Sequence, residues 1–89
     1  SIQLIIRERD RVYKVLSSIE SIKAYPSDAN FIFFKAQDAD NLFSKLVEKD
    51  ILIRNFNRPG RLQNCMRVTI GTPEENDLFL SALTEILAP

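Results

Sequence analysis

An arginine-rich stretch that runs straight into a short apolar segment is the feature that most constrains this chain. Residues 54–72 contain no Asp or Glu but hold four arginines, namely Arg54, Arg58, Arg61 and Arg67. The last of these lies inside the apolar run 66–70, which has the composition of a β-strand. An arginine within an apolar strand is costly to bury unless an anion meets it. We therefore expect Arg67 to lie on a face of the sheet that an anion can reach.

The composition places this basic stretch in a small domain with balanced charge. The chain has 89 residues, of which 45% are hydrophobic and 27% charged, with 12 basic and 12 acidic side chains. A chain of this length is expected to form one domain, residues 1–89, and its balanced charge favours neither a nucleic acid nor a membrane as partner. The lone Cys65 excludes an internal disulfide framework and fits a reducing, cytoplasmic compartment. Because the chain has no histidine, His-based catalysis and histidine metal sites are excluded.

Hydrophobic periodicity predicts a first helix at residues 2–23. Its apolar side chains recur at helical spacing, at Ile5, Val12, Leu16, Ile19 and Ile22. The charged residues between Arg7 and Lys14, with Glu8 among them, are expected to form its solvated face. The first turns are more apolar than a surface helix needs, so we expect them to rest on a neighbouring part of a larger protein.

Two further helices carry start signals as well as periodicity. Asp38 is a good N-cap for a helix at residues 39–49. A helix at residues 73–87 is predicted from a capping box and an N1 proline, formed by Thr72, Pro73 and Glu75. Its buried stripe is expected to comprise Leu78, Phe79, Ala82, Leu83 and Ile86.

Four short strands are expected at residues 22–25, 31–36, 51–53 and 66–70, with a loop at 55–65. The second strand is apolar on both sides, which indicates a central strand covered on both faces. Most of the chain's phenylalanines fit strand or helix periodicity and are assigned to the core: Phe31, Phe33, Phe34, Phe43 and Phe79. In the last strand, Met66, Val68 and Ile70 should face the helices, and Arg67 and Thr69 the other side.

The order helix, two strands, helix, two strands, helix predicts the fold class. Local strand pairs with helices stacked on one face describe an α+β two-layer sandwich with a small antiparallel or mixed sheet. The helix-free face would then be open to solvent in an isolated domain and would form the wall of a cleft in a larger protein.

Arg67 and Arg54 are the candidate binding residues. A guanidinium group meets a carboxylate or phosphate through two parallel hydrogen bonds, which lysine cannot reproduce. If the strands that carry these arginines pair, both can converge on one anion or on two neighbouring anions. The alternative is a surface salt bridge or simple hydration, which is also our expectation for Arg58 and Arg61. We find no catalytic constellation, glycine-rich phosphate loop or metal-ligand cluster.

Three segments closely resemble histidinol-phosphate aminotransferases, which are fold-type I pyridoxal-phosphate enzymes. Residues 64–76 read NCMRVTIGTPEEN, residues 27–35 read SDANFIFFK, and residues 50–55 read DILIRN. They occur in the order and spacing of the C-terminal part of that family, including the thirteen-residue interval between the two arginines. The resemblance covers essentially the whole chain.

The resemblance implies that residues 1–89 are the C-terminal small domain of a larger aminotransferase. The parent enzyme would be a homodimer that uses pyridoxal phosphate to exchange an amino group between glutamate and imidazole-acetol phosphate in histidine biosynthesis. Arg67 would bind the carboxylate of the amino-acid substrate, and Arg54 would lie near the substrate end of the cleft. The Schiff-base lysine and the other cofactor ligands would belong to the missing large domain. This chain alone is therefore expected to bind no cofactor and to have no catalytic residues and no transaminase activity.

Two other interpretations remain open from the sequence. The chain could be a stand-alone regulatory or interaction domain that binds a small anion through its arginines. It could also be the small domain of a related aminotransferase or of an amino-acid phosphate decarboxylase, because the far end of the substrate is recognised largely by other parts of such enzymes. An open reading frame that continues upstream of Ser1 would argue against the stand-alone domain.

Overall fold

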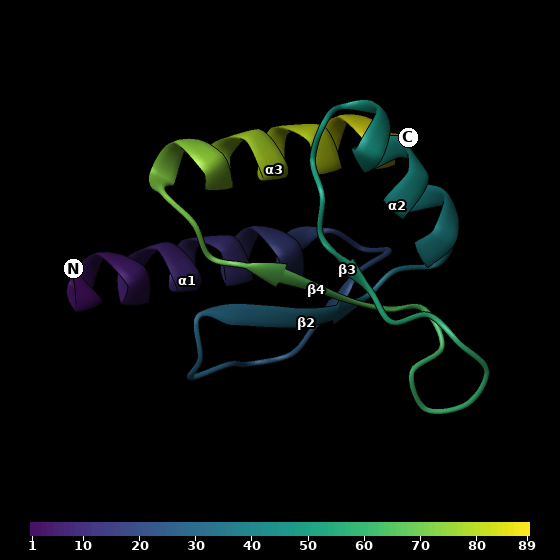
Figure 1. The fold of residues 1–89 in the computed structure, drawn as a ribbon, viewed down its shortest axis with the longest axis horizontal. Helices are drawn as coiled ribbons and strands as arrows, with labels where there is room; N and C mark the ends of the chain where they lie inside the picture. The colour runs from purple at the N-terminus through teal and green to yellow at the C-terminus, as the bar shows by residue number, and fades with distance from the viewer.

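Three helices cover one face of a four-stranded antiparallel sheet in the computed structural model, which describes residues 1–89 (Figure 1). The elements follow in the order α1 (Ile2–Ser18), β1 (Lys23–Ala24), β2 (Phe31–Lys35), α2 (Ala39–Glu48), β3 (Arg54–Asn55), β4 (Cys65–Thr69) and α3 (Pro73–Leu87). In the sheet the order is β1-β2-β4-β3, and every pair of neighbouring strands is antiparallel. The predicted α+β two-layer class is confirmed.

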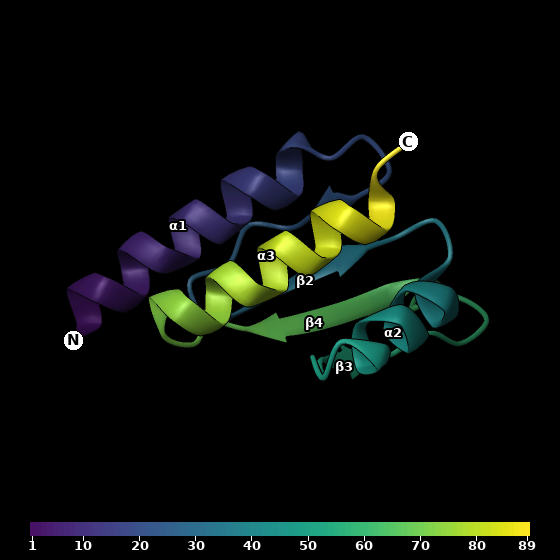
Figure 2. The same cartoon turned by 90° about the horizontal axis from the view of Figure 1, so that it is seen from above.

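Seen from above, α1 and α3 lie side by side over the sheet, and α2 lies on the side of α3 away from α1, next to β3 (Figure 2). The central pair, β2 and β4, is aligned over five residue pairs from Phe31 with Thr69 to Lys35 with Cys65. This register puts Ile32, Phe34, Met66 and Val68 on the helix face, where all four are buried. The predicted inward and outward sides of β4 are confirmed, since Thr69 is exposed and Arg67 is partly exposed on the other face.

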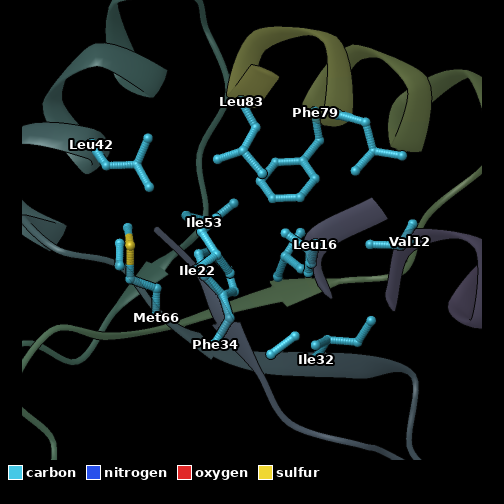
Figure 3. Close-up of a cluster of buried hydrophobic side chains, with 14 of the residues drawn as sticks. Val12, Leu16, Ile22, Ile32, Phe34, Leu42, Ile53, Met66, Phe79 and Leu83 are labelled. Carbon is cyan, nitrogen blue, oxygen red and sulfur yellow. The ribbon is translucent and has the colours of Figure 1, made fainter. Parts of the chain in front are cut away.

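Most of the core lies between the sheet and the helices (Figure 3). Phe79 and Leu83 of α3 point toward the sheet, and the ring of Phe79 lies 6.3 Å from that of Phe34. Val12 and Leu16 of α1 and Leu42 of α2 complete the inner faces of the helices. The core is therefore a single layer between helices and sheet, and the helix-free face of the sheet is not covered by any element of this chain.

Some predicted boundaries were wrong because tertiary pairing overrides local periodicity. The helix expected at residues 2–23 ends at Ser18, where Ile19 becomes extended and lets the chain turn back to pair β1 with β2. The strand expected at 51–53 is irregular and follows a left-handed Asp50, with φ of 62°; the pairing with β4 begins only at Arg54. The helix at 73–87 and its capping box were predicted correctly.

Two side chains lie on the opposite side from the one their helix pattern predicted. Glu8, expected on the solvated face of α1, is only 6% exposed, because Arg11 and Asn76 both bond to its carboxylate. Leu78, expected in the buried stripe of α3, is 65% exposed, and Leu80 is buried in the stripe instead. Both errors have the same cause. The periodicity of a single helix does not specify which neighbouring element packs against it, and that packing decides which side chains are buried.

Candidate functional site

The two candidate arginines are direct neighbours on the helix-free face of the sheet. Arg54 of β3 is the cross-strand partner of Arg67 of β4, and Phe33 of β2 is the partner of Arg67 on its other side. The strands that carry the two arginines, β3 and β4, therefore pair, as the convergence of both arginines on one anion requires. Like charges placed directly opposite each other on a sheet repel. An anion between them would remove that repulsion.

Aromatic rings hold both guanidinium groups in place. The Cζ atom of Arg67 lies 4.8 Å from the ring centroid of Phe31 and 5.7 Å from that of Phe56. The Cζ atom of Arg54 lies 5.0 Å from the centroid of Phe56. A cation over the face of an aromatic ring is attracted by the ring's quadrupole. The rings therefore orient the two cations without neutralising their charge.

Neither arginine has an acidic partner within the chain. The ion pairs of this structure join Arg11 to Glu8 and Asp77, Lys14 to Asp10, and Lys49 to Glu85. The Nε atom of Arg67 is buried and has no hydrogen-bond partner. Buried polar groups are nearly always hydrogen-bonded in folded proteins, so each exception asks for an explanation. The surface salt bridge considered for Arg67 is thus not formed, and its charge remains available to a ligand.

The arginines border a hollow of about 620 Å³ at the edge of the sheet. Because β3 pairs only with the first part of β4, the strand edge near Val68 and Thr69 is left open. The hollow is lined on one side by residues 50–54 and on another by the start of α3, from Gly71 to Phe79. It therefore combines two free cations with an apolar wall that includes Ile51, Leu52 and Leu78.

A side-chain hydrogen bond joins β3 to α2. Asn55 donates a hydrogen bond from Nδ2 to the Oδ1 atom of Asp40, at 2.9 Å. Hydrogen bonds from Asn55 and Asn57 lower the pKa of the Asp40 carboxyl group. The ionised carboxylate of α2 thus bonds to the strand residue that follows Arg54.

The other arginines of the stretch are ordinary loop residues. Arg58 and Arg61 are exposed on the segment between β3 and β4, and neither lines the hollow. This agrees with the expectation that they are hydrated. Cys65 is buried and is not part of a disulfide.

Sequence reasoning missed the aromatic part of the site. Phe31 and Phe33 were assigned to the core, but they lie half-buried on the helix-free face beside Arg67, because the β2–β4 register gives them that side. Phe34, Phe43 and Phe79 do pack in or against the core. Phe56 was not singled out, although its position two residues after Arg54 puts both on one side of an extended segment.

Comparison with known proteins agrees with this fold. The model of the family "Aminotransferase class I and II" matches residues 1–83, so the chain belongs to that family. Among curated relatives, the histidinol-phosphate aminotransferase of Aquifex aeolicus is 41% identical over 94% of this chain and 24% of its own length. The chain therefore spans about a quarter of the length of that relative.

Solved structures of related proteins contain the same fold. A decarboxylase from Sulfurospirillum multivorans is 34% identical, with a TM-score of 0.83 over 96% of this chain and 25% of its own. The histidinol-phosphate aminotransferase of Clostridium acetobutylicum is 28% identical, with a TM-score of 0.85 over 96% and 27%. That of Sinorhizobium meliloti, solved with pyridoxal-5'-phosphate, shares the fold at 23% identity and a TM-score of 0.82 over 96% and 24%. None of the helices of the present chain is long and apolar enough to cross a membrane.

Proposed function

We propose that this chain is the C-terminal small domain of a longer histidinol-phosphate aminotransferase, in which Arg67 binds the carboxylate of the amino-acid substrate. Arg54 lies beside it as a second anion contact near the substrate end of the cleft. The observation that carries the proposal is the pair of cross-strand arginines, which have no acidic partner and border one hollow. A planar guanidinium held by rings is suited to bidentate recognition of a carboxylate or phosphate group.

The parent enzyme in this proposal is a homodimer that transfers an amino group between glutamate and imidazole-acetol phosphate. Supporting the choice of substrate are the family match and the 41% identity to a curated histidinol-phosphate aminotransferase. The NCMRVTIGTPEEN run contains Arg67 itself, so the segment that most favours the histidinol-phosphate branch is also part of the candidate site.

The residues of this chain do not fit the cofactor that such an enzyme uses. Pyridoxal phosphate is bound through a Schiff base to a lysine. No lysine lines the hollow, and Lys14 and Lys49 are paired with Asp10 and Glu85 elsewhere on the surface. We therefore assign the cofactor to the remainder of the parent protein and assign only anion recognition to this chain. Purified chain, freed of contaminating enzyme, should give no transamination; a measurable rate would contradict this assignment.

The test of the site is Arg67→Lys in the full-length parent. Lysine keeps the charge but loses the two-pronged hydrogen bond, and a charged hydrogen bond contributes roughly 1.5–3 kcal/mol. The kcat/KM for the amino-acid substrate should therefore fall by roughly ten- to a hundredfold. Arg61→Lys, on the exposed loop, is the matched control and should leave kcat/KM unchanged. An unaltered kcat/KM in the Arg67 variant would rule out the proposed role.

A decarboxylase parent is the second candidate, because a solved decarboxylase is 34% identical to this chain. The two chemistries differ in product rather than in the anion that Arg67 would hold. The full-length protein supplied with an amino-acid phosphate should release no carbon dioxide if the aminotransferase proposal holds. Carbon dioxide release without formation of an oxo acid would favour the decarboxylase.

A further inference from the structure

A buried carboxylate on α1 is tied to the start of α3, beside the hollow that contains the two arginines. Glu8 is the only acidic side chain buried in the chain, at 6% exposure. Its Oε1 atom accepts hydrogen bonds from Arg11 Nη2 at 2.7 Å and Asn76 Nδ2 at 3.0 Å, and its Oε2 atom accepts one from Arg11 Nε at 3.1 Å. A buried charge that is fully hydrogen-bonded fixes the geometry of its partners, since each lost bond would leave the charge unsatisfied.

Asn76 bonds to the backbone between β4 and α3 as well as to Glu8, so the buried carboxylate also restricts the position of that backbone. Its Nδ2 atom donates a second hydrogen bond to the carbonyl oxygen of Gly71 at 3.1 Å, and its Oδ1 atom accepts one from the Gly71 amide at 2.9 Å. One side chain thus satisfies both backbone groups of the junction residue. Asn76 is itself only 4% exposed, so water does not replace these bonds.

Gly71 is also enclosed from its other side. A Cβ atom at this position would lie 2.6 Å from the Oε1 atom of Glu75, the same oxygen that accepts a hydrogen bond from the amide of Thr72. The junction is therefore held between two side chains of α3. Gly71, Glu75 and Asn76 all line the hollow, and Gly71 follows Arg67 by four residues on the same strand path.

We infer that Glu8 and Asn76 are positioning residues for anion binding. Through Gly71 they fix the position of the start of α3, which borders the hollow (the α3 rim), relative to Arg67 and Arg54. The side-by-side packing of α1 on α3 (Figure 2) is what brings a residue near the N-terminus to this rim. The inference rests on the proposed function, because it concerns the same anion site.

The experiment measures binding of inorganic phosphate to the 89-residue chain by NMR titration in wild type, Glu8→Gln and Asn76→Ala. In metal sites, residues that orient the ligands through hydrogen bonds typically contribute about 10–100-fold to affinity. We expect an effect at the lower end of that range here, so each variant should bind phosphate about tenfold more weakly. The control is Asp77→Asn, which removes the same charge from the other partner of Arg11 without contacting Gly71. If only the loss of a nearby negative charge mattered, Glu8→Gln would bind phosphate more tightly, as the control should. If Glu8 positions the site, the same variant binds phosphate more weakly, so the direction of the change in affinity separates the two explanations.

A second readout is independent of phosphate. The Nε–H signal of Arg67, recorded without any anion, should shift in Glu8→Gln and Asn76→Ala but not in Asp77→Asn. If the wild-type chain binds no phosphate, the proposed anion site is wrong. The shift of the Arg67 signal then still tests whether Glu8 and Asn76 position Arg67. An unshifted Arg67 signal in both variants, or phosphate binding strengthened as in the control, would overturn the inference.

A paired variant covers the possibility that Asn76→Ala fails to fold. In Asn76→Asp two carboxylates face each other, whereas adding Glu8→Gln restores a donor opposite the new carboxylate. The double variant should recover phosphate affinity relative to Asn76→Asp alone. No recovery in a folded double variant would count against the coupling between the two residues.

Discussion

At the scale of single residues, the pKa of the buried Glu8 carboxyl group is strongly lowered. Hydrogen bonds from Arg11, then from Asn76, lower the pKa of its carboxyl group from 4.5 to about 2, against the opposing effect of burial. The unfolded chain therefore binds a proton at Glu8 more readily than the folded chain between these two pKa values. Its contribution to stability is present above about pH 4.5 and is lost as the pH falls toward about 2.

Glu8→Gln should accordingly alter the dependence of stability on acid. The melting temperature of the variant should lie below that of wild type above about pH 5, and the gap should narrow toward about pH 2. Thermal unfolding followed by circular dichroism between these pH values measures it. Glu48→Gln, exposed on α2 and without an ion pair, is the control and should show no such narrowing. A constant gap for Glu8→Gln would mean that the carboxylate is not the source of the effect.

At the scale of elements, α3 has the best-defined start in the chain. The Thr72 hydroxyl accepts a hydrogen bond from the Glu75 amide at 3.1 Å, and the Glu75 carboxylate accepts one from the Thr72 amide at 2.9 Å. The two hydrogen bonds satisfy backbone donors that a helix end otherwise leaves free. The same helix start forms part of the hollow, so its cap serves both the fold and the candidate site.

Replacing Thr72 by alanine should lower the free energy of unfolding by about 1 kcal/mol, within the usual range of roughly 0.5–2 kcal/mol for a lost cap. Urea denaturation with an unchanged slope is the measurement. Thr84→Ala removes the same atoms from an exposed position later in α3, where the hydroxyl bonds only to backbone carbonyls of its own helix. Equal losses from the two variants would show that capping is not what Thr72 contributes.

At the scale of the whole molecule, several large apolar side chains have no partner in the chain. They are exposed by 40–80% and comprise Ile2, Ile5, Ile6, Leu52 and Leu78. Ile2, Ile5 and Ile6 lie at helical spacing on one face of α1, and apolar side chains that gather on one surface commonly mark an interaction site. Since the curated relative from Aquifex aeolicus is about four times longer, we propose that the remainder of the parent protein covers part of this surface.

The isolated chain should therefore self-associate at high concentration. Burying an isoleucine contributes roughly 1.5–3 kcal/mol, so Ile6→Glu should weaken association by about tenfold or more. Light scattering over a concentration series measures the change, and Val47→Glu on α2, away from the start of α1, is the control (Figure 2). A strictly monomeric wild-type chain across the series would contradict the prediction.

The sequence by itself determined the features that depend on near neighbours along the chain. The capping box fixed the start of α3, the alternation in β4 assigned Arg67 to the face away from the helices, and the order of elements gave the two-layer class. These signals are local, since a cap joins residues three apart and side-chain direction in a strand alternates with every residue.

Only the tertiary structure decided what each face would meet. The β2–β4 register put Phe31 beside Arg67 and not in the core, and the pairing of β3 aligned Arg54 with Arg67. Glu8 is buried where α1 packs against α3, and Asn76, 68 residues later in the chain, donates a hydrogen bond to it. A periodic pattern says which side chains share a side of an element but not what packs against that side. The partners of Arg67 and Glu8 were therefore settled only when distant segments came together.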